Sequence, residues 1–153
     1  MSGPRYLSKA YLKERQLNIM DLKDRLTDCI NANVNLPAKL YQSYMTNKIS
    51  PELRIYDLPS TVIDEDYAGN RTEEFIFEIA MRSNDEELIN QTLWDISKYI
   101  SDYDFDLVSQ NNSFSFNKLE VTTFPHIVSA DTEGNVVYLF DFKITVDTYK
   151  ESD

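Results

Sequence analysis

Apolar side chains alternate with polar ones most clearly between Glu73 and Arg82. The apolar positions recur at every second residue: Phe75, Phe77, Ile79 and Met81. The segment from Val136 to Thr148 repeats the pattern over a longer stretch. A period of two is typical of strands that bury one face, so both segments are predicted to be strands. The turn-forming residues Asp131 to Asn135 predict a hairpin that leads into the second one.

Two segments follow the helical period instead. Apolar residues three or four positions apart predict a helix over residues 85–102: Ile89, Leu93, Ile96 and Ile100. Ser83 or Asn84 is its expected cap, and acidic residues fill its first turn. A second stripe predicts an N-terminal helix from Leu7 to about Ile30: Leu12, Ile19, Leu22, Leu26 and Ile30. This helix is long for a small domain, so part of it is expected to pack outside the domain.

The remaining segments carry weaker signals. Residues 36–44 favour a short strand over a helical turn, and Glu52–Leu58, between two prolines, reads as an edge-type strand. The acidic residues 64–66 and the Ala-Gly-Asn at 68–70 predict an exposed loop. Three further strands are expected: Phe105 to Ser109, Ser113 to Phe124, and His126 to Ala130. The order of elements predicts an α+β fold with a long N-terminal helix, a mainly antiparallel sheet and one amphipathic helix packed across it.

The length of 153 residues suits one domain with one core. We expect a helical arm at 1–35, an α+β domain at 36–150 and a polar tail at 151–153. No apolar run is long enough to span a membrane, and the N-terminus lacks the apolar block of a signal peptide, so a soluble protein that is not exported is expected.

The net charge of −11 is unevenly distributed along the chain. Residues 1–50 carry +4 and residues 51–153 carry −15. This balance argues against binding to nucleic acid by phosphate neutralisation and against docking on anionic lipid. A basic arm therefore precedes an acidic body.

Candidate chemistry is sparse. The single cysteine, Cys29, excludes an intrachain disulfide, and the single histidine, His126, excludes mechanisms that need two imidazoles. Asp102, Asp104 and Asp106 begin like a calcium loop, but the glycine and the final glutamate that such a loop needs are missing. No catalytic residue, metal ligand or cofactor site is therefore predicted, an enzyme is not expected, and a binding or assembly role is favoured.

Several of these segments together resemble the minor capsid or tail terminator proteins of long-tailed bacteriophages that infect Gram-positive bacteria. The resemblance covers roughly residues 36–150 and rests on these segments: Leu40-Tyr41, Leu53 to Ser60, Glu74 to Ile79 with Ser83-Asn84, the helix at 85–102, Phe124-Pro125, Asp131 to Asn135, and Tyr138 to Ile144. It implies a helix on a curved antiparallel sheet. It also implies a ring, usually a hexamer, that caps the tail tube, stops tube polymerisation and joins the tail to the neck of the head.

The resemblance implies as partners further copies of the chain, the tail tube protein and a neck protein, with DNA passing through the lumen and no membrane contact. The protein would be made in the host cytoplasm and located in the virion. Eight residues are interface candidates: Arg54, Tyr56, Asp64, Glu65, Asp66, Tyr67, Arg71 and Phe124. The acidic body suits a DNA conduit, although acidic surface also simply keeps a protein soluble. Two alternatives stay open: a head-completion or neck connector protein, and a small acidic cytoplasmic binding module or inhibitor.

Overall fold

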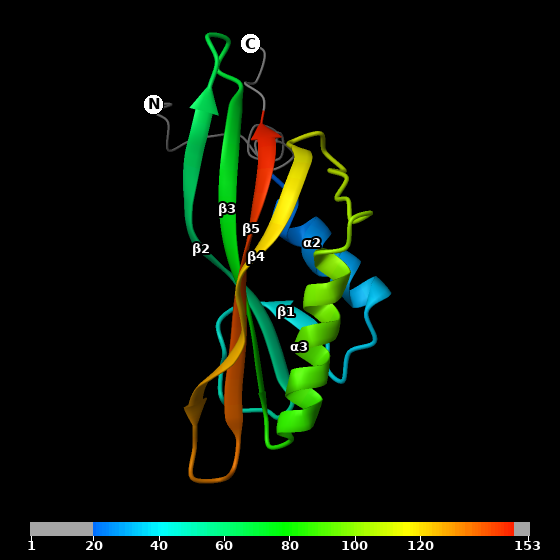
Figure 1. Cartoon of the computed structure of the whole chain (residues 1–153), viewed down its shortest axis with the longest axis vertical. Helices are drawn as coiled ribbons and strands as arrows, with labels where there is room; N and C mark the ends of the chain where they lie inside the picture. The colour runs from blue at the N-terminus through cyan, green and yellow to red at the C-terminus, as the bar shows by residue number, and fades with distance from the viewer. Residues whose placement is uncertain (1–19, 149–153) are drawn as a thin grey trace, which may run out of the picture.

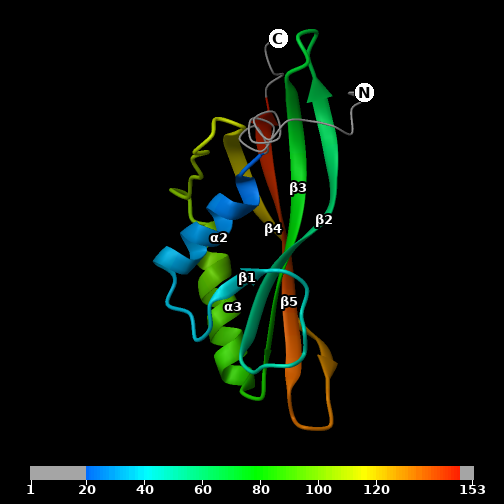
Figure 2. The ribbon, with the colours of Figure 1, turned by 180° about the vertical axis from the view of Figure 1, so that it is seen from behind.

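The computed structural model describes residues 20–148, which form one five-stranded sheet with two helices on one side (Figures 1 and 2). The strand order is β1-β2-β3-β5-β4. The elements in chain order are α2 (Leu22–Asn33), β1 (Leu40–Gln42), β2 (Glu52–Glu65), β3 (Arg71–Ser83), α3 (Glu86–Ile100), β4 (Ser115–Ala130) and β5 (Val136–Thr148). The predicted α+β class and mainly antiparallel sheet are confirmed.

Two long hairpins dominate the sheet. β2 and β3 form one, β4 and β5 form the other, and their tips lie at opposite ends of the molecule (Figure 1). β3 and β5 pair along their full length and join the hairpins. The sheet is so strongly twisted that the order of its strands across the view reverses between the two halves of Figure 1. Only β1 runs parallel to its neighbour β2.

The core lies between the helices and one face of the sheet. It takes alternate residues from the central strands and the apolar stripes of both helices: Phe77, Ile79, Met81, Phe140, Phe142, Ile144, Val146, Leu22, Leu26, Ile30, Ile89, Leu93, Ile96 and Ile100. Burial of each large apolar side chain contributes about 1.5–3 kcal/mol before the loss of conformational entropy. Cys29 of α2 and Tyr99 of α3 also lie 2.7 Å apart from Sγ to the hydroxyl, which links the two helices.

The helix predicted at 85–102 is confirmed as α3, but its cap differs from the expectation. Asp85 is the N-cap, and its carboxylate accepts a hydrogen bond of 3.1 Å from the backbone N–H of Leu88. The Ser83 hydroxyl instead accepts from the N–H of Asp85, 3.0 Å away. The acidic residues of the first turn interact favourably with the positive end of the helix dipole, as predicted.

The long N-terminal helix is not shown. Residues 1–19 of that prediction lie outside the described residues, and α2 begins only at Leu22. Asp21 does not continue a helix because its carboxylate is held by the loop before β4: it accepts from the Ser109 hydroxyl at 2.7 Å and from the N–H of Gln110 at 2.8 Å. The helix then continues past Ile30 to Asn33.

The strand expected at Phe105–Ser109 is wrong. This segment is irregular, apart from one bridge between Val108 and Ser115. Aspartates use the backbone N–H groups locally: the carboxylate of Asp102 accepts from the N–H of Asp104, and that of Asp106 accepts from its neighbour Leu107, both at 2.9 Å. Such local bonds compete with pairing in a sheet.

The two strands expected at Ser113–Phe124 and His126–Ala130 are one strand, β4, and Pro125 lies inside it. An edge strand tolerates proline because its outer side needs no partner within the chain. The register shifts between Thr123 and His126, where β4 bulges. The His126 Nδ1–H donates to the carbonyl of Phe124 at 2.9 Å and braces this bulge.

β2 is also longer than the sequence predicts. The expected segment Glu52–Leu58 continues through Pro59 to Glu65, so Asp64 and Glu65 are strand residues and not loop residues. The register shifts between Leu58 and Thr61, which accommodates the proline. β1, the predicted short strand, pairs with Leu53–Ile55, so β2 forms an edge of the sheet only beyond that point.

Glu52 is a buried carboxylate at the start of β2, with a side chain that is 0% exposed. It accepts hydrogen bonds from Thr46 and Asn47 and pairs with the Arg54 guanidinium at 2.9 Å. Burial opposes ionisation, but these donors outweigh it and lower the pKa of Glu52. The carboxylate thereby fixes the loop before β2 to the sheet.

We expect Glu52→Gln to lower the free energy of unfolding by about 2–4 kcal/mol, because it leaves the half-buried Arg54 guanidinium and two backbone donors poorly satisfied. Urea unfolding followed by circular dichroism measures this. The control Glu120→Gln removes an exposed pair with Lys118 and should leave the free energy of unfolding nearly unchanged. Equal effects of the two variants would contradict the assigned role of Glu52.

A second acidic group lies on the sheet face away from the helices. Tyr56 of β2, Glu78 of β3 and Asp141 of β5 are cross-strand neighbours, and the Tyr56 hydroxyl donates to Glu78. One oxygen of Asp141 is buried without a hydrogen-bond partner among the described residues. Burial and the adjacent Glu78 raise the pKa of Asp141 to about 7. Asp141 is therefore mostly protonated below neutral pH.

Because Asp141 binds its proton more tightly in the folded chain than at its usual pKa of 3.8, stability should fall as the pH rises from about 4 to 7. Asp141→Asn should remove this slope and stabilise the chain at pH 8 by about 1–2 kcal/mol, a value reduced for solvent screening. Urea unfolding at pH 5 and pH 8 measures it. Asp147→Asn, on the same strand and face, is the control, and a slope that survives Asp141→Asn would refute the assignment.

Candidate interaction surfaces

The surface carries the informative features of this chain. In the part that the structure describes, no three metal-ligating side chains gather in one place. None of the described helices is both long and apolar enough to cross a membrane. Large apolar side chains are instead exposed in groups, and such groups mark sites of contact between proteins.

The exposed apolar side chains concentrate at the two opposite edges of the sheet. One group, here called the β2 edge, belongs to β1 and to the outer half and tip of the β2–β3 hairpin: Tyr41, Val62, Ile63 and Tyr67. Tyr44 and Ile49 are also exposed, in the loop after β1. The other, here called the β4 edge, consists of Phe124, Ile127 and Val128. Edge strands also present backbone groups that can pair with another chain. Both edges are thus suited to contact with a second protein.

Asp66 and Tyr67 form the tip of the β2–β3 hairpin. The Asp66 carboxylate accepts from the N–H groups of Ala68 and Asn70 at 2.9 and 3.0 Å, and these bonds, led by those of Asn70, lower the pKa of Asp66. Gly69 has a φ of +87°, the left-handed region that favours glycine. The Asp66 carboxylate therefore stabilises the turn, whereas the Tyr67 ring is fully exposed.

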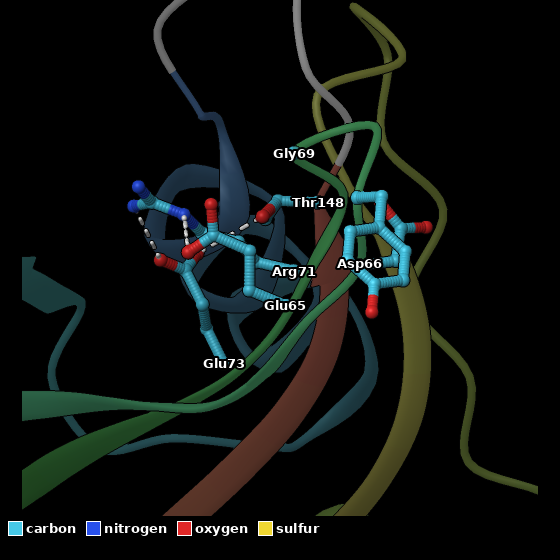
Figure 3. A pocket seen from close by; sticks show the side chains of 7 residues that line it. Glu65, Asp66, Gly69, Arg71, Glu73 and Thr148 are labelled. Atoms are coloured by element: carbon cyan, nitrogen blue, oxygen red, sulfur yellow. Dashed lines mark hydrogen bonds and ion pairs between the residues drawn. The ribbon is translucent and has the colours of Figure 1, made fainter.

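A hollow of about 570 Å³ lies beside this tip (Figure 3). Arg71 lies between two carboxylates, with Nε 3.3 Å from Glu65 and Nη1 4.0 Å from Glu73. Thr148 of β5 donates its hydroxyl to Glu73 at 3.2 Å. Exposed ion pairs of this kind contribute little to stability. The hollow therefore presents an ion pair, Glu65 with Arg71, whose contribution to the stability of the chain is small.

Arg54 and Tyr56 lie nearer the start of β2 and are held by contacts within the chain. Arg54 pairs with Glu52 and lies over the Tyr41 ring, 5.3 Å from its centre. The Tyr56 ring packs against Tyr44 at 4.9 Å, and burial together with Glu78 raises the pKa of Tyr56. Asp64, the last of the candidates near the tip, is exposed on β2. Of the eight predicted residues, Asp64, Glu65, Asp66, Tyr67 and Arg71 lie together, and Phe124 lies across the sheet.

Sequence reasoning missed three exposed apolar residues near Phe124. Trp94 is 50% exposed on α3, and Ile127 and Val128 are each 49% exposed on β4. The helical spacing does carry a signal for Trp94, because it falls outside the stripe of Ile89, Leu93, Ile96 and Ile100. No comparable signal existed for Ile127 and Val128, since their exposure depends on β4 lying at the sheet edge.

Comparison with known proteins gives a family and a fold. A family described as bacteriophage tail terminator protein matches residues 17–148. A chain from the virion of a native gene transfer agent particle has a similar fold, with a TM-score of 0.58 at 11% identity; the match covers 82% of this chain and 94% of that one. A search of the curated proteins finds no match.

The family match spans every element from α2 to β5, so it applies to the whole described fold. It confirms the resemblance that the sequence segments carry, and it selects the tail terminator over the neck connector and the acidic binding module. The protein is a structural component of the virion. The chain therefore belongs to the bacteriophage tail terminator family.

Proposed function

We propose that six copies of this chain form a ring that covers the last ring of tail tube protein, ends tube polymerisation and presents its other face to a neck protein. The role is structural and not catalytic. The observation that carries the proposal is the pair of unlike apolar edges on opposite sides of one sheet. The Gram-positive host and synthesis in the host cytoplasm stay predictions of the sequence resemblance.

Two unlike edges favour a head-to-tail contact between identical subunits. Such a contact joins the β4 edge of one copy to the β2 edge of the next, and it produces a closed ring when the rotation between copies permits closure. Within the described residues, β4 pairs only with β5 apart from the bridge between Ser115 and Val108, and β2 beyond Ile55 pairs only with β3. Strand pairing between subunits would satisfy these open backbone groups and bury the exposed apolar side chains.

The acidic charge of the body suits the passage of DNA through such a ring. Residues 51–153 carry −15, and the outer part of the β2–β3 hairpin contributes Asp64, Glu65 and Asp66. Carboxylates that border the lumen repel phosphate groups, so the genome passes without being gripped. Contact with DNA would be transient and independent of its sequence.

The ring contact can be tested with one variant at each edge. Val128→Lys blocks the β4 edge and Val62→Lys blocks the β2 edge, because each places a charge where an apolar side chain is to be buried. Each variant alone should be monomeric by native mass spectrometry. A mixture of the two should give only dimers. The intact β2 edge of Val128→Lys can contact the intact β4 edge of Val62→Lys, and no further subunit can then be added.

Tyr103→Lys is the control for this experiment, because Tyr103 is 99% exposed beyond the C-terminal end of α3 and belongs to neither of the two edge groups. It should assemble like the unaltered chain. Variants that assemble fully would refute the edge contact, and a mixture that stays monomeric would show that the contact is not head-to-tail.

Loss of the ring should also appear in particles. Phage that carry Val128→Lys are expected to have tails of irregular and extended length that are not joined to heads, because uncapped tubes continue to polymerise. Electron microscopy of tail lengths measures this, with Tyr103→Lys phage as the control. Tails of uniform, normal length on heads would contradict the proposed function.

A further inference from the structure

An apolar groove lies between α3 and the bulge of β4. It has a volume of about 410 Å³ and is lined by Glu87, Asn90, Gln91, Trp94, Phe124 and Pro125. Two aromatic rings form its apolar part, with Phe124 71% exposed and Trp94 50% exposed. The bond from His126 to the Phe124 carbonyl holds the bulge that positions this ring. The groove is therefore built by rigid elements and not by a loose loop.

Nothing in the packing of α3 requires Trp94 to be aromatic. The helix buries its opposite stripe, Ile89, Leu93, Ile96 and Ile100, completely against the sheet. Trp94 and Phe124 are exposed side by side, so burial of the two rings by a partner would contribute favourable free energy. Aromatic side chains of this kind are frequent at the centres of protein interfaces.

The charges around the groove define the chemistry of its occupant. Glu86 and Glu87 lie in the first turn of α3 and Asp95 follows Trp94, whereas Lys98 is the only basic residue of this helix. An apolar groove with an acidic border fits a segment that combines aromatic or aliphatic side chains with basic ones.

Residues 1–19 of this chain have that composition. They contain Arg5, Lys9, Lys13 and Arg15 against one acid, Glu14, so their net charge is +3. Their apolar side chains include Tyr6, Leu7, Tyr11, Leu12, Leu17 and Ile19. The segment joins the described fold at Met20, which packs against the core. A chain of 19 residues spans at most about 60 Å when fully extended, at about 3.3 Å per residue. This reach allows contact with a neighbouring subunit of the proposed ring.

We propose that the groove between α3 and β4 binds residues 1–19 of a neighbouring copy of the chain. The inference rests on the proposed ring, because the ring supplies a neighbour at a fixed position. The outer side of β4 contacts the β2 edge of the neighbour, while the groove on the α3 side receives the basic segment. The segment thus adds a second link between subunits and neutralises part of the acidic surface.

Photo-crosslinking in the full chain tests the inference directly. The variant Phe124→p-benzoylphenylalanine is made as isotopically heavy and light chains, which are mixed, assembled and irradiated. Mass spectrometry should find adducts between heavy and light chains that map to residues 1–19. The same amino acid at Tyr103 is the control and should give no such adduct. Adducts within a single chain, or to any other segment or partner, would overturn the proposal.

Self-association provides an independent measurement. Trp94→Ser, and separately Lys9→Glu combined with Lys13→Glu, should each weaken assembly by at least about tenfold, whereas Tyr103→Ser should change it by less than about twofold. The mass of the assembly is determined in the same samples. A ring that forms normally in all these variants refutes the groove proposal alone. Failure of the unaltered chain to form any ring refutes the proposed function as well.

Discussion

The packing of both helices against one face of a strongly twisted sheet determines most other features of this protein. α2 and α3 cover the face that carries Phe77, Ile79, Phe140 and Phe142, and together they complete a single core. No helix covers the opposite face or the two edges among the described residues, and the loop between β1 and β2 packs on part of that face through Tyr44 and Ile49. Domains of this size commonly use further elements to protect such edges. Here the exposed edges are apolar, which makes them a natural place for contacts between subunits.

Two carboxylates on the sheet, Glu52 and Asp141, have pKa values that are shifted in opposite directions. Glu52 is fully buried yet ionised, since an arginine and several backbone donors surround it. Asp141 is less enclosed, but burial and the neighbouring Glu78 carboxylate raise its pKa to about 7 against a smaller opposing effect of His126. The hydrogen-bond donors and charges near each carboxylate, and not its depth of burial, determine which of the two is ionised at neutral pH. Only Glu52 therefore strengthens the isolated subunit at neutral pH.

The sequence predicts the elements that repeat regularly and fails where tertiary contacts override local preference. β3, β5 and α3 follow from their periods because each buries one continuous face. Pro59 and Pro125 were expected to separate strands, but edge strands tolerate proline, and edge position cannot be known from local sequence. The helix start at Leu22 depends on bonds from Asp21 to a loop about 90 residues away. Among the interface candidates, spacing indicates that Tyr67 and Phe124 lie beside turns, but only the folded sheet shows that they lie at opposite edges.

The proposed ring places opposing requirements on its subunits. They need enough exposed apolar surface to form the ring, yet they must not pair edge to edge without limit. The twist of the sheet helps, because a strongly twisted edge pairs over a short length only. The bulges in β2 and β4 shorten each regular edge further. The net charge of −11 adds repulsion between subunits and so disfavours contact through a single edge. In the proposed ring, closure forms several modest contacts together, so a closed ring is favoured over an open chain of subunits.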